Sequence, residues 1–209
     1  MKSFKQLLKE SYENVPLNES TLGRVTYHAN NSNIAVLTAF RKDVPLETNI
    51  KNNEILRDKI KEAGYGYIHV LGHYIENYGT PTERPVEEHS FLVIGKRGDD
   101  NNQLLNDAKK WGEEFNQDSI LHKKYNEDVA YFYGTSRRSD SYPGYGKSFS
   151  VGKFHPNMAG DFHTILKDRR TFAFAESVEG DTRKKYTFTF QPNYFDAKER
   201  VEQLYFSLK

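Results

Sequence analysis

Between residues 34 and 122 the hydrophobic pattern alternates between that of strands and that of helices, and few folds accept the resulting order. The run at residues 34–40 is almost wholly apolar, which is typical of a strand buried on both faces. The periodicity predicts further strands at residues 65–76, 87–95 and 119–122, and helices at residues 48–63 and about 100–116. The order β-α-β-β-α-β is that of the split βαβ, or ferredoxin-like, arrangement. We therefore predict an α+β fold with a mixed sheet and its helices on one face.

The rest of the chain extends this core. Short strands are predicted at residues 129–133, 172–175 and 186–190, and an apolar stripe at residues 197–208 predicts a C-terminal helix. The length of 209 residues suits one domain with an appendage. We expect residues 1–20 to form the appendage and residues 21–209 a single domain. Within it, the core spans 34–134, a flexible loop rich in Gly, Ser and aromatic residues spans 135–160, and a C-terminal extension spans 161–209.

Charge and cysteine content exclude several classes of protein. The 30 Lys and Arg balance 29 Asp and Glu, so a protein that coats polyanions is not expected. Cysteine is absent, which removes disulfides, thiolate catalysis and iron–sulfur clusters. No apolar run approaches the roughly 18 residues of a membrane span, and no secretory signal is visible. We accordingly expect no cofactor, no metal site and no membrane partner.

The N-terminus has a distinctive pattern. Phe4, Leu7, Leu8 and Tyr12 lie on one stripe of a predicted short helix, and the triplets that end at Glu10 and at Glu19 each place Leu two residues before Glu. This segment resembles the capsid-targeting sequence of internal head proteins of T-even-like phages. The resemblance implies cleavage after Glu10 or Glu19 by a prohead protease, a place in the virion interior and later delivery to the host cytoplasm.

A second pattern covers about half of the chain. It consists of Thr38-Ala39-Phe40, an Asn-rich helix start at residues 49–53, Gly64-Tyr65, the strand at residues 87–93, and Phe115-Asn116-Gln117-Asp118-Ser119. In this respect residues 34–134 are similar to a bacterial and phage family of small α/β domains of unknown function. The resemblance implies one compact fold and transfers no catalytic residue.

The mouth of the predicted hairpin between residues 65–76 and 87–95 holds candidate acid–base groups. His89 and Glu88 lie there, with His73, Glu76 and Glu87 nearby, and such a cluster suits general acid–base catalysis or, with a further ligand, a divalent metal ion. His163 is a further candidate for proton transfer. Strand alternation places neighbouring residues on opposite faces, so the cluster also fits ordinary ion pairs at a strand end.

Arg41 lies just beyond the apolar strand, and Asn52 and Asn53 follow in the first helix. A guanidinium beside a helix N-terminus suits a phosphate or carboxylate. The alternative is that Arg41 pairs with Asp43 or Glu47 while the asparagines cap the helix.

The segment from residue 137 to 153 interleaves cations with aromatic rings. Rings and cations together suit single-stranded nucleic acid, and a surface loop that binds a protein partner fits equally well. The residues concerned are Arg137, Arg138, Tyr142, Tyr145 and Lys147.

These features favour a binding protein over an enzyme. The first hypothesis is a phage accessory protein, packaged in the head and injected, that binds or inhibits a host factor such as a defence enzyme. The second is a small enzyme acting on a nucleotide or nucleic-acid phosphate, with Arg41 holding the anion, His89 or His163 moving the proton and Glu88 orienting the imidazole. The third is a structural virion component.

Overall fold

The computed structural model describes residues 22–76, 81, 84–157, 163–166 and 170–175, all within the first of two compact units, residues 1–178 and 179–209. The predicted N-terminal helix, Glu10, Glu19, the strand at residues 186–190 and the C-terminal helix lie outside these residues. In the described part of the chain, no helix has the length and apolar character needed to cross a membrane.

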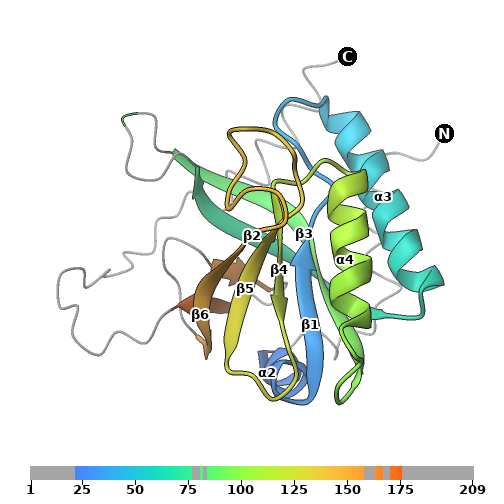
Figure 1. Ribbon diagram of the computed structural model, residues 1–209, viewed down its shortest axis with the longest axis vertical. Helices are drawn as coiled ribbons and strands as arrows, with labels where there is room; N and C mark the ends of the chain where they lie inside the picture. The colour runs from blue at the N-terminus through green and yellow to red at the C-terminus, as the bar shows by residue number, and fades with distance from the viewer. Residues whose placement is uncertain (1–21, 77–80, 82–83, 158–162, 167–169, 176–209) are drawn as a thin grey trace. The chain divides into compact units, whose positions relative to one another are not determined.

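Eight strands form a closed barrel in the order β1-β3-β2-β7-β8-β6-β5-β4 (Figure 1). Every pairing between neighbouring strands is antiparallel. The strands are β1 Ser32–Leu37, β2 Gly66–Glu76, β3 Arg84–Arg97, β4 Ser119–Lys123, β5 Val129–Gly134, β6 Ser148–Pro156, β7 His163–Ile165 and β8 Thr171–Ala175. The helices are α2 Leu22–Asn31, α3 Leu46–Glu62 and α4 Gln103–Glu114.

The prediction of a ferredoxin-like mixed sheet was wrong. The elements from β1 to β4 do follow the order β-α-β-β-α-β, but their sheet is not open. The pairing of β4 with β5 and of β2 with β7 continues the ladder, and β6 and β8 close it. Closure pairs the edges that an open sheet would leave exposed.

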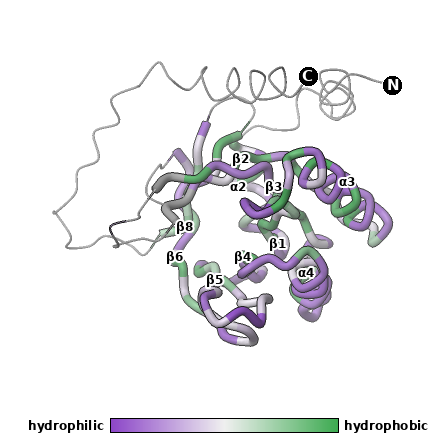
Figure 2. Tube along the Cα trace, turned by 90° about the horizontal axis from the view of Figure 1, so that it is seen from above, coloured by the Kyte–Doolittle hydropathy of each residue, from purple (hydrophilic) through white to green (hydrophobic). Residues whose placement is uncertain are grey.

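Two apolar clusters lie on the two faces of this sheet. The outer cluster joins β1, β3 and β4 to the apolar stripes of α3 and α4, with Leu56, Ile60, Leu104 and Trp111 among its members. The inner cluster fills the barrel with side chains such as Ile34, Leu92, Leu121 and Phe172. Seen from above, α3 and α4 lie outside the ring of strands (Figure 2). An eight-stranded barrel is just wide enough for side chains to fill its interior.

Helix α2 closes one end of the barrel (Figure 1). Leu22, Val25 and Ala29 lie on one face of this helix and belong to the inner cluster. The buried Lys123 reaches the same end, where its Nζ donates a hydrogen bond to the Ala29 carbonyl over 2.5 Å. This contact satisfies one of the free carbonyls in the last turn of α2. Because α2 covers this end, the opposite end of the barrel is the candidate for ligand binding.

Candidate functional site

The candidate site lies at the end of the barrel opposite α2, which we call the distal end. Strand β1 follows directly on α2 and runs away from it, so Thr38 and the segment after it lie at the distal end. Because the neighbouring strands are antiparallel, β3, β4 and β6 begin there and β2 and β5 end there. Small-molecule sites are often found at the mouths of β-barrels.

The inner face becomes polar toward this end. Along β3, Ile94 and Leu92 belong to the inner cluster, and strand alternation places Ser90 and Glu88 on the same face. Glu88 pairs with Gly72 of β2, which has no side chain. A Cβ at Gly72 would lie 3.3 Å from Ser90 Oγ, tighter than most Cβ contacts. The backbone of β2 at Gly72 thus lies close against Ser90, and a side chain at this position would crowd the Ser90 hydroxyl.

Thr38 connects the end of β1 to β3. Its hydroxyl donates to the His89 carbonyl over 2.6 Å and accepts from the Phe40 amide over 3.0 Å. Asn53 of α3 accepts from the Ala39 amide over 3.1 Å and donates to the same His89 carbonyl over 3.4 Å. These bonds fix the chain where it leaves the barrel wall.

Asn49 and Gln117 fix the next turn, residues 40–44. The Asn49 side chain accepts from the Arg41 amide over 2.9 Å and donates to the carbonyls of Arg41 and Val44 over 2.7 and 3.0 Å. Gln117 donates to the Phe40 carbonyl over 3.1 Å. Asn52 lies half-buried on α3. The asparagines of α3 therefore hold backbone groups of the segment that carries Arg41.

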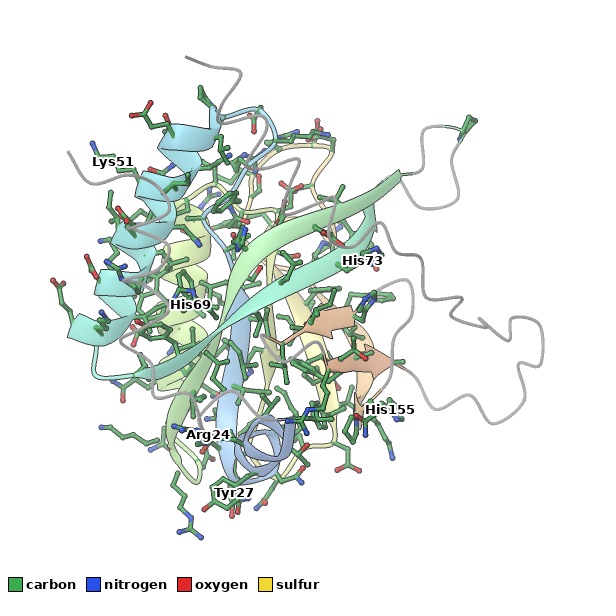
Figure 3. All side chains as sticks on the ribbon, turned by 180° about the vertical axis from the view of Figure 1, so that it is seen from behind. Arg24, Tyr27, Lys51, His69, His73 and His155 are labelled. Atoms are coloured by element: carbon green, nitrogen blue, oxygen red, sulfur yellow. The ribbon has the colours of Figure 1, made fainter. Side chains whose placement is uncertain are left out.

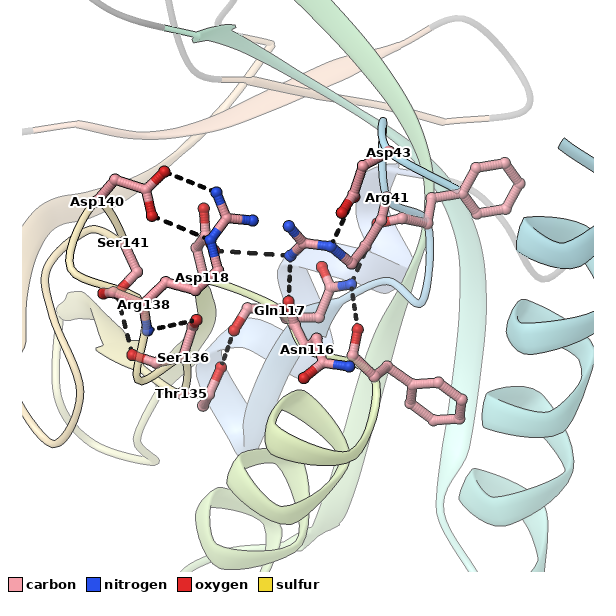
Figure 4. Close-up of polar contacts among 12 residues, drawn as sticks. Arg41, Asp43, Asn116, Gln117, Asp118, Thr135, Ser136, Arg138, Asp140 and Ser141 are labelled. Atoms are coloured by element: carbon pink, nitrogen blue, oxygen red, sulfur yellow. Dashed lines mark hydrogen bonds and ion pairs between the residues drawn. The ribbon is translucent and has the colours of Figure 1, made fainter. Parts of the chain in front are cut away.

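Arg41 itself is the centre of a polar network (Figure 4). Its Nε donates to Asp43 over 3.0 Å, and Nη1 donates to the Asn116 carbonyl and lies 3.6 Å from Asp118. A backbone hydrogen bond at Asp43 and the Arg41 guanidinium lower the pKa of the Asp43 carboxyl. Only 14% of the Arg41 side chain is exposed. Asp43 and Asp118 balance its positive charge within the protein.

The loop between β5 and β6 borders the same network. Thr135 donates to the Gln117 carbonyl over 2.6 Å, and Arg138 donates to both oxygens of Asp140 over 3.0 and 2.7 Å (Figure 4). This pairing lowers the pKa of the Asp140 carboxyl. Arg137 lies 3.7 Å from the centroid of the Tyr145 ring. Lys147 is exposed, and its backbone pairs with Gly134 and Gly144.

The three acid–base candidates divide between the two faces of the sheet. Glu88 lies on the inner face, whereas its neighbour His89 lies on the outer face, where its ring is 5.7 Å from Phe40. His163 of β7 pairs with His73 of β2, and their rings stack with centroids 4.4 Å apart. His73 lies toward the distal end of β2, away from α2 (Figure 3). Among the residues that the structure describes, no group of His, Asp and Glu could hold a metal ion.

One comparison with known proteins bears on the function. A model of the S-adenosylmethionine lyase family matches residues 35–195. The chain belongs to this family. The match runs through the barrel from β1 to β8 and includes the distal end. A search of curated proteins found no match.

Membership of an enzyme family corrects the functional predictions. The chain is not identified as a phage accessory or head protein, a structural virion component or a domain of unknown function. The alternative of an enzyme acting on a nucleotide or nucleic-acid phosphate does not fit either. The preference for a binding protein over an enzyme was wrong. The head-protein resemblance misled because it rested on a short amphipathic pattern that many helices share.

Sequence reasoning missed Thr38, Ser90, Gly72 and Gln117 as members of the distal end. Their position follows from the register of β1, β2 and β3, which strand periodicity alone does not supply. The one available indication was the change from the polar residues Glu88 and Ser90 to the apolar run at residues 91–94 within one strand.

Proposed function

We propose that this protein cleaves S-adenosylmethionine in a lyase reaction at the distal end of the barrel. The observation that carries the proposal is the family match, which extends over the strands that form this end. The position of Glu88, Ser90 and Thr38 on or beside the inner face supplies the polar groups that orient a ligand in a largely apolar barrel.

The chemistry of the substrate suits a site without a complete acid–base set. A lyase breaks a bond without adding water, and the sulfonium of S-adenosylmethionine is a good leaving group. The substrate's own α-carboxylate oxygen can attack the γ-carbon to form a five-membered lactone. As the C–O bond forms, the C–S bond breaks and its electron pair passes to sulfur, giving neutral 5′-methylthioadenosine and a homoserine lactone that keeps the ammonium. No proton moves in this step.

Such a reaction needs orientation and exclusion of water. Holding the carboxylate against the γ-carbon replaces a search over many conformers by one reactive geometry. The step also consumes one negative and one positive charge, so its transition state is less charged than the bound substrate. The apolar inner cluster below the distal end is suited to this loss of charge, because an apolar surrounding disfavours the separate carboxylate and sulfonium charges more than the less charged transition state.

Glu88 is the residue we assign to the amino-acid end of the substrate. The substrate carries an ammonium and a sulfonium against one carboxylate, so a carboxylate side chain attracts its net positive charge. Glu88 lies on the inner face two residues before Ser90 of β3 and pairs with Gly72 of β2. An ion pair with the ammonium would leave the substrate carboxylate free to attack.

The test is the incubation of the purified protein with S-adenosylmethionine, followed by mass spectrometry of the products. We expect 5′-methylthioadenosine and homoserine lactone. In H₂¹⁸O, the γ-oxygen of any homoserine formed later should remain unlabelled, because lactone opening places the water oxygen in the carboxyl group. Label in the γ-hydroxyl would show hydrolysis, and an absence of cleavage would contradict the proposal outright.

The role of Glu88 has its own test. Glu88→Gln keeps the shape and removes the charge, so kcat/KM for S-adenosylmethionine should fall by at least about tenfold, which corresponds to about 1.4 kcal/mol of lost stabilisation. Glu62→Gln, at the C-terminal end of α3, is the matched control and should leave the rate unchanged. Equal activity of Glu88→Gln and the wild type would remove Glu88 from the site.

A further inference from the structure

Two large aromatic side chains lie exposed beside each other near the distal end. Tyr142 is 55% exposed and Phe149 is 50% exposed, and their rings meet edge to face with centroids 5.3 Å apart. Exposure of one ring is common on a protein surface, but two in contact with each other form a small apolar platform.

The register of β6 places Phe149 on the inner face of the barrel. Phe149 pairs directly with Phe132 of β5, which packs against the inner cluster. Directly paired residues of an antiparallel ladder point to the same face. Phe149 therefore lies on the inner face, at the beginning of β6 and at the distal end, where half of its surface is exposed. In the order of the eight strands, β6 lies opposite β3, which carries Glu88.

The loop that carries Tyr142 is held in place by a close backbone approach. A Cβ at Gly134 would lie 1.9 Å from the Gly144 carbonyl oxygen, so a glycine is required for the loop to return against β5. Gly134 binds Lys147 and Gly146 through backbone hydrogen bonds of 2.9 and 3.1 Å. The Ser141 hydroxyl is 3.0 Å from the Ser136 carbonyl and 2.8 Å from that of Arg138. Little conformational entropy is then lost when a ligand uses the platform.

The charges of the loop argue against an anionic ligand. The Arg137 guanidinium lies over the Tyr145 ring and donates to its hydroxyl over 2.7 Å, and Tyr145 in turn donates to Glu113 over 3.0 Å. Arg138 is paired with Asp140. The arginines expected to bind a nucleic-acid backbone thus have partners within the protein. A neutral flat ring suits the remaining surface better than a phosphate does.

From this geometry we infer that Tyr142 and Phe149 form the platform for the adenine of S-adenosylmethionine, with one ring stacked on the purine and the other against its edge. The inference rests on the proposed function, which supplies the adenine. It assigns the two ends of the substrate to opposite walls of the barrel, with the purine at β6 and the amino-acid end at β3. Stacking on an aromatic ring recognises a purine through its π-face.

The first measurement is binding of 5′-methylthioadenosine by titration calorimetry, because this probe retains the adenine and lacks the amino-acid end. Phe149→Ala and Tyr142→Ala should each weaken binding by roughly 5- to 100-fold, as loss of one stacking ring does elsewhere. Phe149→Tyr keeps a ring and should bind as the wild type does. Tyr27→Ala removes a comparably exposed ring, 48% accessible on α2 at the closed end, and should have no effect (Figure 3).

The second measurement is kcat/KM for S-adenosylmethionine in the same variants, which should follow the same order. Urea unfolding of each variant shows whether a loss of affinity or of kcat/KM comes from misfolding. Phe149→Tyr keeps the ring, so a loss in Phe149→Ala that is absent from Phe149→Tyr comes from removal of the ring. Equal affinity of Phe149→Ala and the wild type for 5′-methylthioadenosine, or no binding by the wild type, would overturn the platform. Binding that depends on Phe149 without any cleavage of S-adenosylmethionine would overturn the proposed function and leave the platform standing.

Discussion

At the scale of single residues, folding buries the imidazole of His122 almost completely. Its side chain is 2% exposed on β4, and its Nε2 has no hydrogen-bond partner. Burial, together with the positive charges of Lys109, Lys123 and Lys124, lowers the pKa of His122 to about 4. The neutral form is therefore the one that the folded protein accepts near neutral pH.

This predicts acid sensitivity. Between pH 6.5 and about 4 the unfolded chain binds a proton at His122 and the folded chain does not, so stability present above pH 6.5 is lost as the pH falls through this window. The difference amounts to about 3 kcal/mol. In urea unfolding at pH 7.5 and 4.5, His122→Leu should lose less stability on acidification than the wild type. His155→Leu, a half-buried histidine of β6, is the control. Parallel losses in wild type and His122→Leu would refute this origin.

The asparagines of α3 show what residue type alone leaves open. Asn53 was predicted to help bind an anion, because an amide beside a helix start suits one. In the structure its amide bonds to the Ala39 amide and the His89 carbonyl. The same donors and acceptors serve a ligand or the backbone equally well, and only the fold of residues 38–44 decides between them. That fold depends on contacts from α3, β3 and the turn after α4, which are distant in sequence.

At the scale of elements, α4 depends on a glycine for its contact with the barrel. A Cβ at Gly112 would lie 2.8 Å from both Ile120 and Thr135, so Gly112→Ala should destabilise the protein by about 1–3 kcal/mol through overpacking. It would also disturb the Thr135 bond to Gln117. Gly23 of α2 has no atom within 4 Å of such a Cβ, and Gly23→Ala should stabilise by up to about 1 kcal/mol. Thermal unfolding of both variants measures the contrast, and equal shifts would contradict the packing argument.

The sequence predicted most of the strands and helices with a clear apolar period, but it missed the short helix α2, whose stripe is Leu22, Val25 and Ala29, and the strand β6. It predicted β1, α3, β2, β3, α4 and β4 within a few residues of their observed bounds. It treated residues 135–160 as a loop because they are rich in Gly and Ser, yet residues 148–156 form β6. Strand β6 lies in the barrel wall with a bulge opposite β5, and that irregular register hides its alternation.

At the scale of the whole molecule, closure of the barrel depends on a strand of three residues. Strand β7 pairs with β2 at three positions and with β8 at two. A strand of three residues is too short to show an alternation of apolar and polar residues. The sequence therefore contains no sign of the strand that closes the barrel, and an open sheet was the simpler inference. The ladders that join β3 to β1 and to β2 are longer than those of β7, so more backbone hydrogen bonds hold them together.

Amide hydrogen exchange should show this difference. Peptides that cover residues 90–94 of β3 should exchange slowest, because β3 is paired on both sides and Leu92 and Val93 are fully buried. Peptides that cover residues 163–166 should exchange at least about tenfold faster at neutral pH, since few ladder bonds hold them. Mass spectrometry at several labelling times measures both. Comparable protection of the two segments would mean that the barrel opens only as a unit.

The position of β7 in the chain also has a consequence for synthesis. A ribosome completes β2 long before it completes β7 and β8, the strands that later cover the edge of β2 and join it to β6. During that interval the nascent chain presents an unpaired edge of up to eleven residues at β2. Chains terminated before residue 163 would keep that edge permanently, and aggregation of such fragments should limit the yield of any shortened form of the protein.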